Sequence, residues 1–297
     1  MTTETTANPG SGAKPGKGTS SGCPRDYLTN GFVYVVMSPR ARGLSVGVNL
    51  NPDQACNFDC LYCEIDRSRA SGSIRPELDV ESMARELEAT LNVVRSGKIR
   101  EIPNFSTLPE NLLQLRHVAI SGDGEPTLSP KFAEAVDAVI SLRARGQFPF
   151  FPIVLITNAS GLSRPEVGDA LRLFTARDEI WLKLEAGSDE YMQRVNKPDC
   201  SIESIQTNIL NLSRQRPVVI QSLFPSINGE GPSAQEIEAY AQRLRWIKAA
   251  GGQISLVQIY SATRPAARSI CGHLPLRTLS QIAQKVREVA GVNAEVF

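Results

Sequence analysis

Net charge, long apolar runs and cysteine are all scarce in this sequence. The formal net charge is only +1 at pH 7 over 297 residues, so no strong electrostatic field of either sign indicates a nucleic acid or a basic partner. No apolar stretch approaches the roughly 18 residues that a membrane-spanning helix needs, and we expect no membrane association. The chain has six cysteines, and three of them fall within eight positions.

The amino-terminal segment lacks an apolar core. Residues 1–22 are rich in Thr, Gly, Ser, Pro and Lys, which excludes a secretory signal and leaves too little apolar surface to fold. We therefore expect residues 1–27 to be a disordered tail and residues 28–297 to form one domain. Without an export signal the expected compartment is the cytoplasm, where clustered cysteines more often bind metal or react than form disulfides.

Downstream of the tail, apolar strand-like segments alternate with amphipathic helical segments. Strands are expected at 44–50, 115–122, 151–158, 179–187, 218–224 and 254–260, and helices at 80–94, 129–146, 163–174, 201–215, 233–250 and 279–291. Apolar strands that alternate with helices are typical of a parallel sheet with helices outside it. A closed barrel of this type has eight units, so six units predict an α/β fold with an open, partial (β/α)6 TIM-like barrel.

Two of the expected helices carry clear start and stop signals. Asp79 precedes the 80–94 segment as an N-cap. In the 129–146 segment Ser129 is the expected cap, Pro130 the first helical residue and Gly146 the stop. The second helix is therefore expected to begin directly after Ser129.

Polar side chains recur at the carboxyl end of each expected strand. In α/β barrels the catalytic groups lie at these ends, on the loops that lead into the helices. The residues concerned are Cys56, Cys60, Cys63, Gly124, Glu125, Asn158, Lys183, Glu185, Ser188, Gln221, Tyr260 and Arg264. Polar groups at the ends of otherwise apolar runs predict a binding face above a packed core.

The stretch CNFDCLYC, residues 56–63, crowds three cysteines into the loop after the first of these strands. The spacing lets three thiolates converge on one centre. Structural zinc sites are almost always closed by four Cys or His ligands, and neither His117 nor His273 has a paired ligand nearby in the sequence. Three thiolates without a fourth ligand favour an iron–sulfur cluster with one exchangeable iron over zinc.

These motifs resemble those of the radical S-adenosylmethionine (radical SAM) superfamily. The C-x3-C-x2-C spacing, with Tyr62 before the last cysteine, is similar to its cluster motif, and SGDGEPTL (121–128) is similar to its Gly-Glu-Pro motif. With LITNASGL and VQIYSATRP, the sequence most resembles a bacterial subgroup grouped with the wyosine-type tRNA synthases. The resemblance covers nearly all of residues 28–297 and implies the partial TIM-like barrel of that superfamily.

The resemblance also implies the cofactors and their contacts. Cys56, Cys60 and Cys63 would hold a [4Fe–4S] cluster whose fourth iron binds S-adenosylmethionine (SAM). The residues implied to contact SAM are Tyr62 beside the adenine, Gly124 and Glu125 at the methionine amino group, Asn158, Lys183, Glu185 and Ser188 at the ribose and methionine carboxylate, and Gln221 and Tyr260 at the adenosyl end.

Several of these residues also have a purely structural interpretation. Lys183 and Glu185 are unlike charges on one strand face, and Gln221 can be a hydrogen-bonded strand amide. Two residues are candidates for a direct role in the reaction. Arg264 can bind an anionic substrate or pair with a surface acid. Cys200 is typical of a small buried hydrophobe, with a hydrogen-atom donor or a cluster ligand as the alternatives.

The function implied by the resemblance is that of a radical SAM enzyme. The cluster would reductively cleave SAM to a 5′-deoxyadenosyl radical that abstracts a hydrogen atom from an unassigned substrate, with flavodoxin or ferredoxin as electron donor. A small molecule, a peptide or a tRNA can be that substrate. The alternatives are a wyosine-like tRNA base modification and a non-enzymatic iron–sulfur or zinc-binding protein.

The wyosine alternative has a sequence feature against it. The wyosine synthases build a second cluster from three further cysteines on the amino-terminal side of the motif. This chain has only Cys23 there. A second cluster of that kind is therefore not expected.

Overall fold

The computed structural model describes residues 30–65, 77–263 and 270–297. The expected tail at residues 1–27, Cys23 and Arg264 lie outside these ranges. No helix within them is long and apolar enough to cross a membrane.

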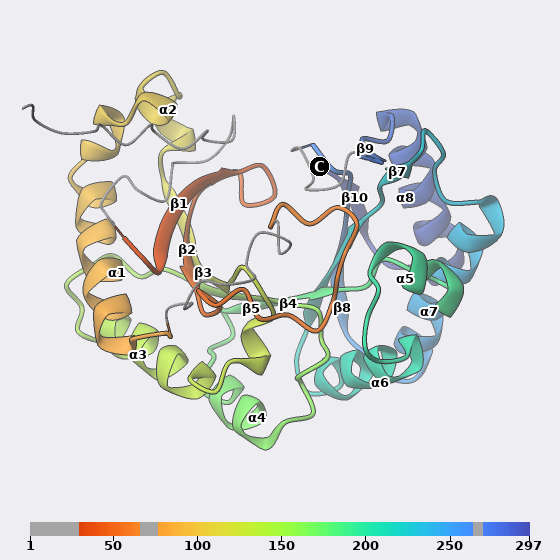
Figure 1. The fold of residues 1–297 in the computed structure, drawn as a ribbon, viewed down its shortest axis with the longest axis horizontal. Coiled ribbons are helices and arrows are strands. Elements are labelled where there is room, and N and C mark those ends of the chain that lie inside the picture. The colour runs from red at the N-terminus through yellow and green to blue at the C-terminus, as the bar shows by residue number, and fades with distance from the viewer. Residues whose placement is uncertain (1–29, 66–76, 264–269) are drawn as a thin grey trace, which may run out of the picture.

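An eight-stranded, mostly parallel sheet forms the framework (Figure 1). The strands in spatial order are β1 (Val33–Ser38), β2 (Gly43–Asn49), β3 (Leu115–Ser121), β4 (Ile153–Thr157), β5 (Glu179–Lys183), β6 (Val218–Leu223), β8 (Ile254–Tyr260) and β10 (Ala294–Val296). Only β1 pairs antiparallel, with β2, and all other neighbours are parallel. The carboxyl ends of the parallel strands therefore share one edge of the sheet.

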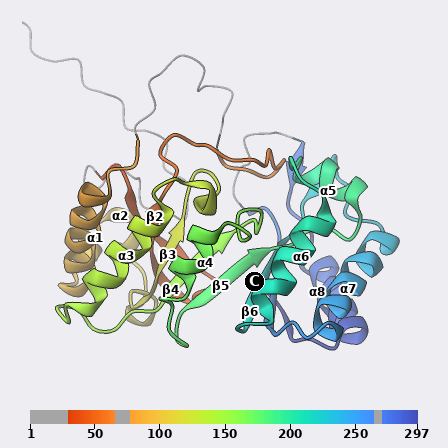
Figure 2. The ribbon, with the colours of Figure 1, turned by 90° about the horizontal axis from the view of Figure 1, so that it is seen from below.

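Helices cover the outer, convex side of this curved sheet (Figures 1 and 2). They are α1 (Val80–Arg95), α2 (Pro103–Ser106), α3 (Phe132–Ala144), α4 (Pro165–Leu171), α5 (Asp189–Val195), α6 (Ile202–Ser213), α7 (Ala234–Ala249) and α8 (Leu276–Ala290), with short 3-10 turns at Lys98–Glu101, Glu110–Leu112 and Pro126–Leu128. Strands β7 (Ser226–Ile227) and β9 (Cys271–Gly272) form a separate small ladder.

The alternation of side chains along the strands separates two apolar regions. Outward residues such as Ile180, Leu182 and Ile220 pack under the helices in the main core. Inward residues Val154, Trp181 and Val219 form a small cluster of their own inside the barrel. Polar side chains farther along the same strands must therefore point into the space above this inner cluster.

A buried histidine completes the floor of the barrel interior. His117 on β3 shares a hydrogen bond with the Ser45 hydroxyl at 2.9 Å, and its ring meets Trp181 edge-on at 5.4 Å between centroids. Burial, assisted by the positive charge of Arg40, lowers the pKa of His117 from its ordinary 6.5 to about 4. The floor is therefore neutral at physiological pH.

The partial barrel is confirmed, and its six predicted strands correspond to β2, β3, β4, β5, β6 and β8. Three helix starts differ from the prediction: α4 begins at Pro165 rather than at 163, α8 begins at Leu276 rather than at 279, and the start of α3 is also wrong. Helix α3 begins at Phe132 after Lys131, with no side-chain cap, because Ser129 instead ends the 3-10 turn Pro126–Leu128. Strand β1 and helix α5 were not predicted.

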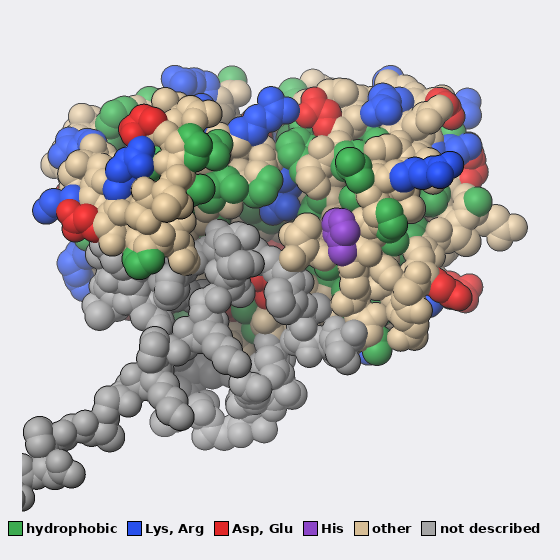
Figure 3. Space-filling view, turned by 90° about the horizontal axis from the view of Figure 1, so that it is seen from above, with side chains coloured by type: hydrophobic (Ala, Val, Ile, Leu, Met, Phe, Trp, Pro, Cys, Tyr) green, Lys and Arg blue, Asp and Glu red, His purple; other side chains and the backbone are tan. Residues whose placement is uncertain are grey.

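The barrel is open between its edge strands β1 and β10, at the top of Figure 1 and facing the viewer in Figure 3. The turn that joins β1 to β2 extends across this gap. There Arg42 forms an ion pair with Glu295 of β10, with 3.4 Å between Nη2 and Oε2. Both side chains are largely exposed, and such pairs contribute at most about 1 kcal/mol.

Candidate active site

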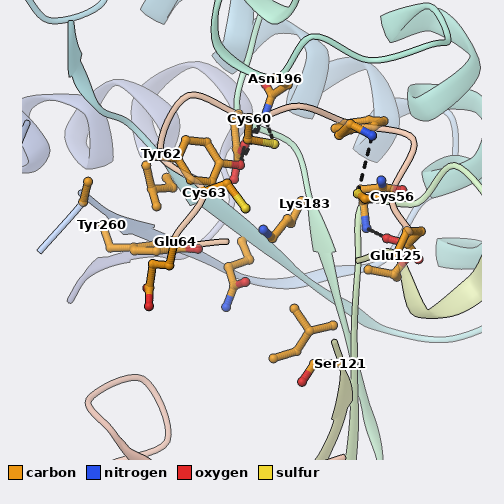
Figure 4. A pocket seen from close by; sticks show the side chains of 18 of the residues that line it. Cys56, Cys60, Tyr62, Cys63, Glu64, Ser121, Glu125, Lys183, Asn196 and Tyr260 are labelled. Carbon is orange, nitrogen blue, oxygen red and sulfur yellow. Dashed lines mark hydrogen bonds between the residues drawn. The ribbon is translucent and has the colours of Figure 1, made fainter. Parts of the chain in front are cut away.

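A cavity of about 440 Å³ lies at the carboxyl ends of the parallel strands. Its lining brings together most of the residues that the sequence singled out (Figure 4). They are Cys56, Cys60, Tyr62, Cys63, Gly124, Glu125, Asn158, Lys183, Glu185, Gln221 and Tyr260. Residues from widely separated parts of the chain therefore share one space.

Backbone hydrogen bonds fix the cysteine loop against the end of helix α5. The Asp59 N–H donates to the carbonyl of Asn196 at 3.0 Å, and the Leu61 N–H donates to that of Val195 at 2.8 Å. Phe58 also forms a β-bridge with Pro198. Since Phe58 and Leu61 are buried, the loop is anchored by both backbone pairing and packing.

The three thiols of this loop are all half-buried. The Asn196 side-chain amide donates to the Cys60 sulfur at 3.5 Å, and the Phe58 N–H donates to the Cys56 sulfur at 3.4 Å. Burial, with the nearby Glu185 charge, raises the pKa of the Cys60 thiol to about 11. A bound cation would be needed to hold this sulfur as a thiolate at neutral pH.

The donor set suits an iron–sulfur cluster. Thiolates are the ligands that such clusters use, and all three thiols line the same cavity. In the described ranges no group of three or more Cys, His, Asp or Glu side chains is arranged to hold a single metal ion. Figure 4 shows Cys60 and Cys63 beside Tyr62, with Cys56 on the side of Glu125.

Glu125 is buried and bound on both carboxylate oxygens. Its Oε1 accepts hydrogen bonds from the Thr127 N–H and hydroxyl and from the Thr157 hydroxyl, at 3.0, 2.6 and 2.5 Å. Its Oε2 accepts from the Asn158 N–H at 2.7 Å. Burial raises the pKa of this carboxyl, against the effect of these hydrogen bonds. The side chain ties the loop after β3 to the end of β4.

Gly124 allows this loop to approach the cysteine loop closely. A Cβ atom at position 124 would lie 1.7 Å from the carbonyl oxygen of Ala55, and the neighbouring Glu125 N–H donates to that same oxygen at 3.2 Å. Any side chain at this position would push the two loops apart. The glycine at position 124 is therefore needed for steric reasons, in addition to any chemical role of this loop.

A second buried carboxylate, Glu185, has a different environment. Its Oε2 accepts hydrogen bonds from the Tyr62 hydroxyl and the Asn196 side-chain amide. Its Oε1 is buried and accepts no well-formed hydrogen bond from the described residues, although the Leu223 N–H lies near enough to the carboxyl to lower its pKa. A buried acceptor of this kind costs free energy unless a ligand supplies a donor.

Lys183 is the positive group beside this carboxylate. Its ammonium lies 5.5 Å from the centroid of the Tyr62 ring. Burial is the largest single effect and lowers the pKa of Lys183, but the charges of Glu185, Tyr260, Cys60 and Cys63 together raise it overall. The lysine is therefore a permanent positive charge in the cavity.

Tyr260 and Gln221 lie farther along the lining, on β8 and β6. The Gln221 amide donates to Gln258 at 3.3 Å. The guanidinium carbon of Arg40 lies 4.3 Å from the centroid of the Tyr260 ring. One face of Tyr260 is therefore covered, and only its other face and its edge remain open to a ligand.

Two candidate residues do not reach this cavity. Ser188 caps helix α5 by accepting from the Tyr191 N–H at 3.1 Å, and its hydroxyl donates to Glu236 at 2.5 Å. Cys200 follows the segment that pairs with the cysteine loop but does not line the cavity. Arg264 lies outside the described ranges.

Asn196, Tyr34 and Arg40 are among the lining residues that the sequence interpretation missed. Asn196 contacts Cys60, Tyr62 and Glu185, but no local pattern identifies it. Tyr34 and Arg40 come from strand β1 and its turn, which the apolar run VYVVM would have indicated. The Tyr34 ring lies over Gly47, and its hydroxyl hydrogen-bonds that of Ser121 at 2.7 Å.

Comparison with known families gives one match over most of the chain. A model described as the radical SAM superfamily matches residues 50–244. That range holds the cysteine loop, the Gly122–Glu125 loop and the ends of β4, β5 and β6. A curated relative, the UPF0026 protein of Helicobacter pylori, is 26% identical over 270 residues, which cover 84% of this chain and 78% of the relative.

Two solved structures share the fold. Streptococcus suis SuiB bound to SAM aligns with a TM-score of 0.58 at 14% identity, over 87% of this chain and 52% of SuiB. The chain thus spans about half of SuiB. A structure of TYW1 with a lysine-pyruvate adduct bound aligns with a TM-score of 0.55 at 14% identity, over 88% of this chain and 85% of TYW1. At this identity the likeness concerns the fold alone.

Proposed function

Since the chain belongs to the radical SAM superfamily, whose cofactors are a [4Fe–4S] cluster and SAM, we propose that Cys56, Cys60 and Cys63 hold that cluster and leave one iron for SAM. The observation that carries this assignment is the shared cavity, which three thiols of one loop line together with buried charged groups. Members of this superfamily are enzymes, and we propose that this chain is one.

When bound, the reduced cluster supplies the electron that cleaves SAM into methionine and a 5′-deoxyadenosyl radical able to take a hydrogen atom from a substrate. The protein's own part is to position both reactants and exclude water. The hydrogen bond from Asn196 to the Cys60 sulfur helps to hold that sulfur as a ligand, in the way that second-layer donors tune iron–sulfur centres.

The charges of the cavity suggest how SAM is oriented. Lys183 suits the methionine carboxylate, as the permanent positive charge described above. The unpartnered Oε1 of Glu185 suits a ribose hydroxyl, which is a neutral donor. Both oxygens of Glu125 are already used, so we assign the methionine ammonium to backbone carbonyls of the Gly122–Gly124 segment rather than to that side chain.

The remaining contacts follow from the lining. Asn158, Gln221 and the open side of Tyr260 are proposed to contact the adenosyl part. Tyr62, whose hydroxyl is bound to Glu185, is proposed to lie beside the adenine. Ser188 would then act through helix α5 rather than by touching SAM.

The chain also needs a one-electron donor, for which we propose flavodoxin or ferredoxin. The candidate substrate classes are a small molecule, a peptide and a tRNA, because radical chemistry acts on all three. The fold shared with TYW1 is not sufficient to favour a wyosine-like reaction. The wyosine synthases use three further cysteines before the cluster motif, whereas the sequence before Cys56 contains only Cys23.

Anaerobic reconstitution with iron and sulfide tests the proposal. With dithionite and SAM, the wild-type chain should form 5′-deoxyadenosine, and SAM should alter the electron paramagnetic resonance spectrum of the reduced cluster. A correctly loaded cluster that yields no 5′-deoxyadenosine would refute the enzyme assignment.

Cysteine variants test the ligand set. Cys60→Ala should lose both the cluster and SAM cleavage. Cys200→Ala is the matched control, because this half-buried thiol does not line the cavity, and it should keep both. A Cys60→Ala protein that binds iron and sulfide at wild-type stoichiometry would show that the ligand assignment is wrong.

A further inference from the structure

Two arginines in one tight turn face opposite ways. The turn joins β1 to β2 and is closed by a hydrogen bond from the Arg42 N–H to the Pro39 carbonyl at 3.1 Å. Arg42 has 76% of its side chain exposed and pairs with Glu295. Arg40 is half-buried and lines the cavity.

The guanidinium of Arg40 is held in place but makes no ion pair with any residue of the described ranges. It stacks on Tyr260 at 4.3 Å, and its Nε is buried with no hydrogen-bond partner in the described part of the chain. Its charge is felt by His117 in the barrel floor, whose pKa it helps to lower, so the group points inward. A stacked guanidinium is pre-organised to offer its edge N–H groups to a carboxylate or phosphate.

The other positive side chain in the described lining is Lys183, which is close enough to Tyr260 to affect its pKa. In Figure 4 Lys183 stands centrally, between the cysteines and Glu125, while Tyr260 lies toward the opposite side. In the proposed function Lys183 takes the methionine carboxylate of SAM. Arg40, beside Tyr260, is then a positive group that SAM does not use.

We propose that Arg40 recognises a carboxylate or phosphate group of a small-molecule substrate that enters through the gap between β1 and β10. This assignment rests on the proposed function, because it takes the Lys183 side of the cavity as the SAM site. It gives the β1–β2 turn a role in choosing the substrate.

The dimensions and charge of the molecule favour a small substrate over a nucleic acid. A cavity of about 440 Å³ is in the range of single small-ligand sites, and it must hold SAM as well. The net charge of +1 gives no broad basic field of the kind that drives RNA binding.

Chemical modification of arginine tests the anion site in the holoprotein. The SAM-bound protein is treated with phenylglyoxal, alone or with inorganic phosphate, acetate or bulk tRNA, and modification of Arg40 and Arg42 is followed by peptide mass spectrometry. We expect phosphate or acetate to slow the modification of Arg40 roughly fivefold or more, and that of the control Arg42 hardly at all. Whichever anion protects identifies the substrate group as a phosphate or a carboxylate.

Three outcomes would overturn the inference. Protection by neither small anion would show that Arg40 is not an anion site. Protection by tRNA alone would replace the small molecule with a nucleic acid. Complete protection by SAM alone would make Arg40 a cofactor contact.

A binding measurement separates this inference from the proposed function. Equilibrium dialysis should show that the affinity for SAM falls about tenfold or more in Lys183→Gln and less than about threefold in Arg40→Gln. Equal losses would assign Arg40 to SAM. A wild-type protein that binds SAM but does not cleave it would instead refute the proposed function, while the result for Arg40 would still stand.

Discussion

Glu125 and Glu185 border the same cavity, and burial raises the pKa of both carboxyls, yet the protein uses them differently. Glu125, after β3, accepts four hydrogen bonds from its own loop and from the end of β4. Glu185, after β5, has one oxygen bound by Tyr62 and Asn196 and one oxygen without a partner.

The difference shows that burial alone does not distinguish a ligand-binding carboxylate from a structural one. What separates them is the number of donors that the protein itself supplies. A carboxylate that is fully satisfied holds the backbone in place, while one with a spare acceptor can be satisfied by a ligand. The comparison can be tested by substitutions at each glutamate, at the neighbouring Gly124 and at His117 in the barrel floor.

The largest effect is expected beside Glu125, from Gly124→Ala. The new Cβ would lie 1.7 Å from the Ala55 carbonyl oxygen, so the two loops must separate, and we expect a loss of roughly 3 kcal/mol or more in the free energy of unfolding. Urea unfolding measures this. Gly168→Ala, in helix α4 with nothing within 4 Å of its Cβ position, is the control and should gain about 0.5–1 kcal/mol. A Gly124→Ala protein as stable as the wild type would contradict the close packing of the loops.

The next largest effect is expected on the pH dependence of stability, through the buried side chain of His117. The pKa of His117 is lowered from 6.5 to about 4, chiefly by burial. The folded protein binds this proton more weakly than the unfolded chain, so stability is fully present above pH 6.5 and is lost as the pH falls toward 4. Lowering the pH from about 7 to about 4.5 should cost about 2–3 kcal/mol through this residue.

His117→Gln should remove that part of the pH dependence. The difference from wild type, measured by urea unfolding at both pH values, isolates the histidine from the carboxylates that titrate in the same range. The chain has only two histidines, and the other, the exposed His273, provides the control His273→Gln. An unchanged slope in His117→Gln would mean that the floor histidine is not buried as described.

A moderate effect is expected for Glu125→Gln. The amide oxygen can replace Oε1, but the amide nitrogen then faces the Asn158 N–H, which needs an acceptor. This mismatch should cost about 1–3 kcal/mol in the free energy of unfolding. Thermal and urea unfolding check it. If the variant matches the wild type, the carboxylate does not hold the two strand ends together.

The smallest effect on stability is expected for Glu185→Gln, at about 1 kcal/mol. The amide can keep the bonds from Tyr62 and Asn196 and its nitrogen takes the place of Oε1, so the cost comes from the negative charge that the buried Lys183 loses beside it. SAM affinity should nevertheless fall about tenfold, since the acceptor proposed for the ribose becomes a donor. Equilibrium dialysis of the reconstituted protein measures this. The opposite pattern, a lost fold with intact SAM binding, would reverse the comparison between the two glutamates.

The sequence predicted the parallel framework well, because each buried strand is a continuous apolar run with a polar residue at its end. It also located the residues that line the cavity, such as Cys60, Lys183 and Glu185, since strand ends of one sheet meet at one edge. Which oxygen of Glu125 or Glu185 has a partner could not be predicted, because several donors come from distant parts of the chain: the end of β4, the cysteine loop and the residue after helix α5.

Long-range contacts and the direction of side chains in a turn explain which residues the sequence interpretation missed. Asn196 matters because the end of α5 folds back against the cysteine loop, a pairing that no periodic pattern records. Arg40 and Arg42 are two residues apart in one turn, and only the folded turn determines that one points inward and the other pairs with Glu295. Ser129 is of the residue type that caps helices, but a serine can also end a 3-10 turn, as Ser129 does after Pro126–Leu128.

The anchoring of the cysteine loop has a consequence for how the holoprotein is made. The bonds that Asp59 and Leu61 donate to Asn196 and Val195 at the end of helix α5 are made between backbone groups, so we expect the cysteine loop to be held in place before a cluster is bound. Small zinc domains, by contrast, acquire their structure only when the metal arrives. Cluster delivery can therefore be the last stage of maturation here, carried out on a finished scaffold, and a chain stripped of its iron by oxygen would keep the form needed to be reloaded.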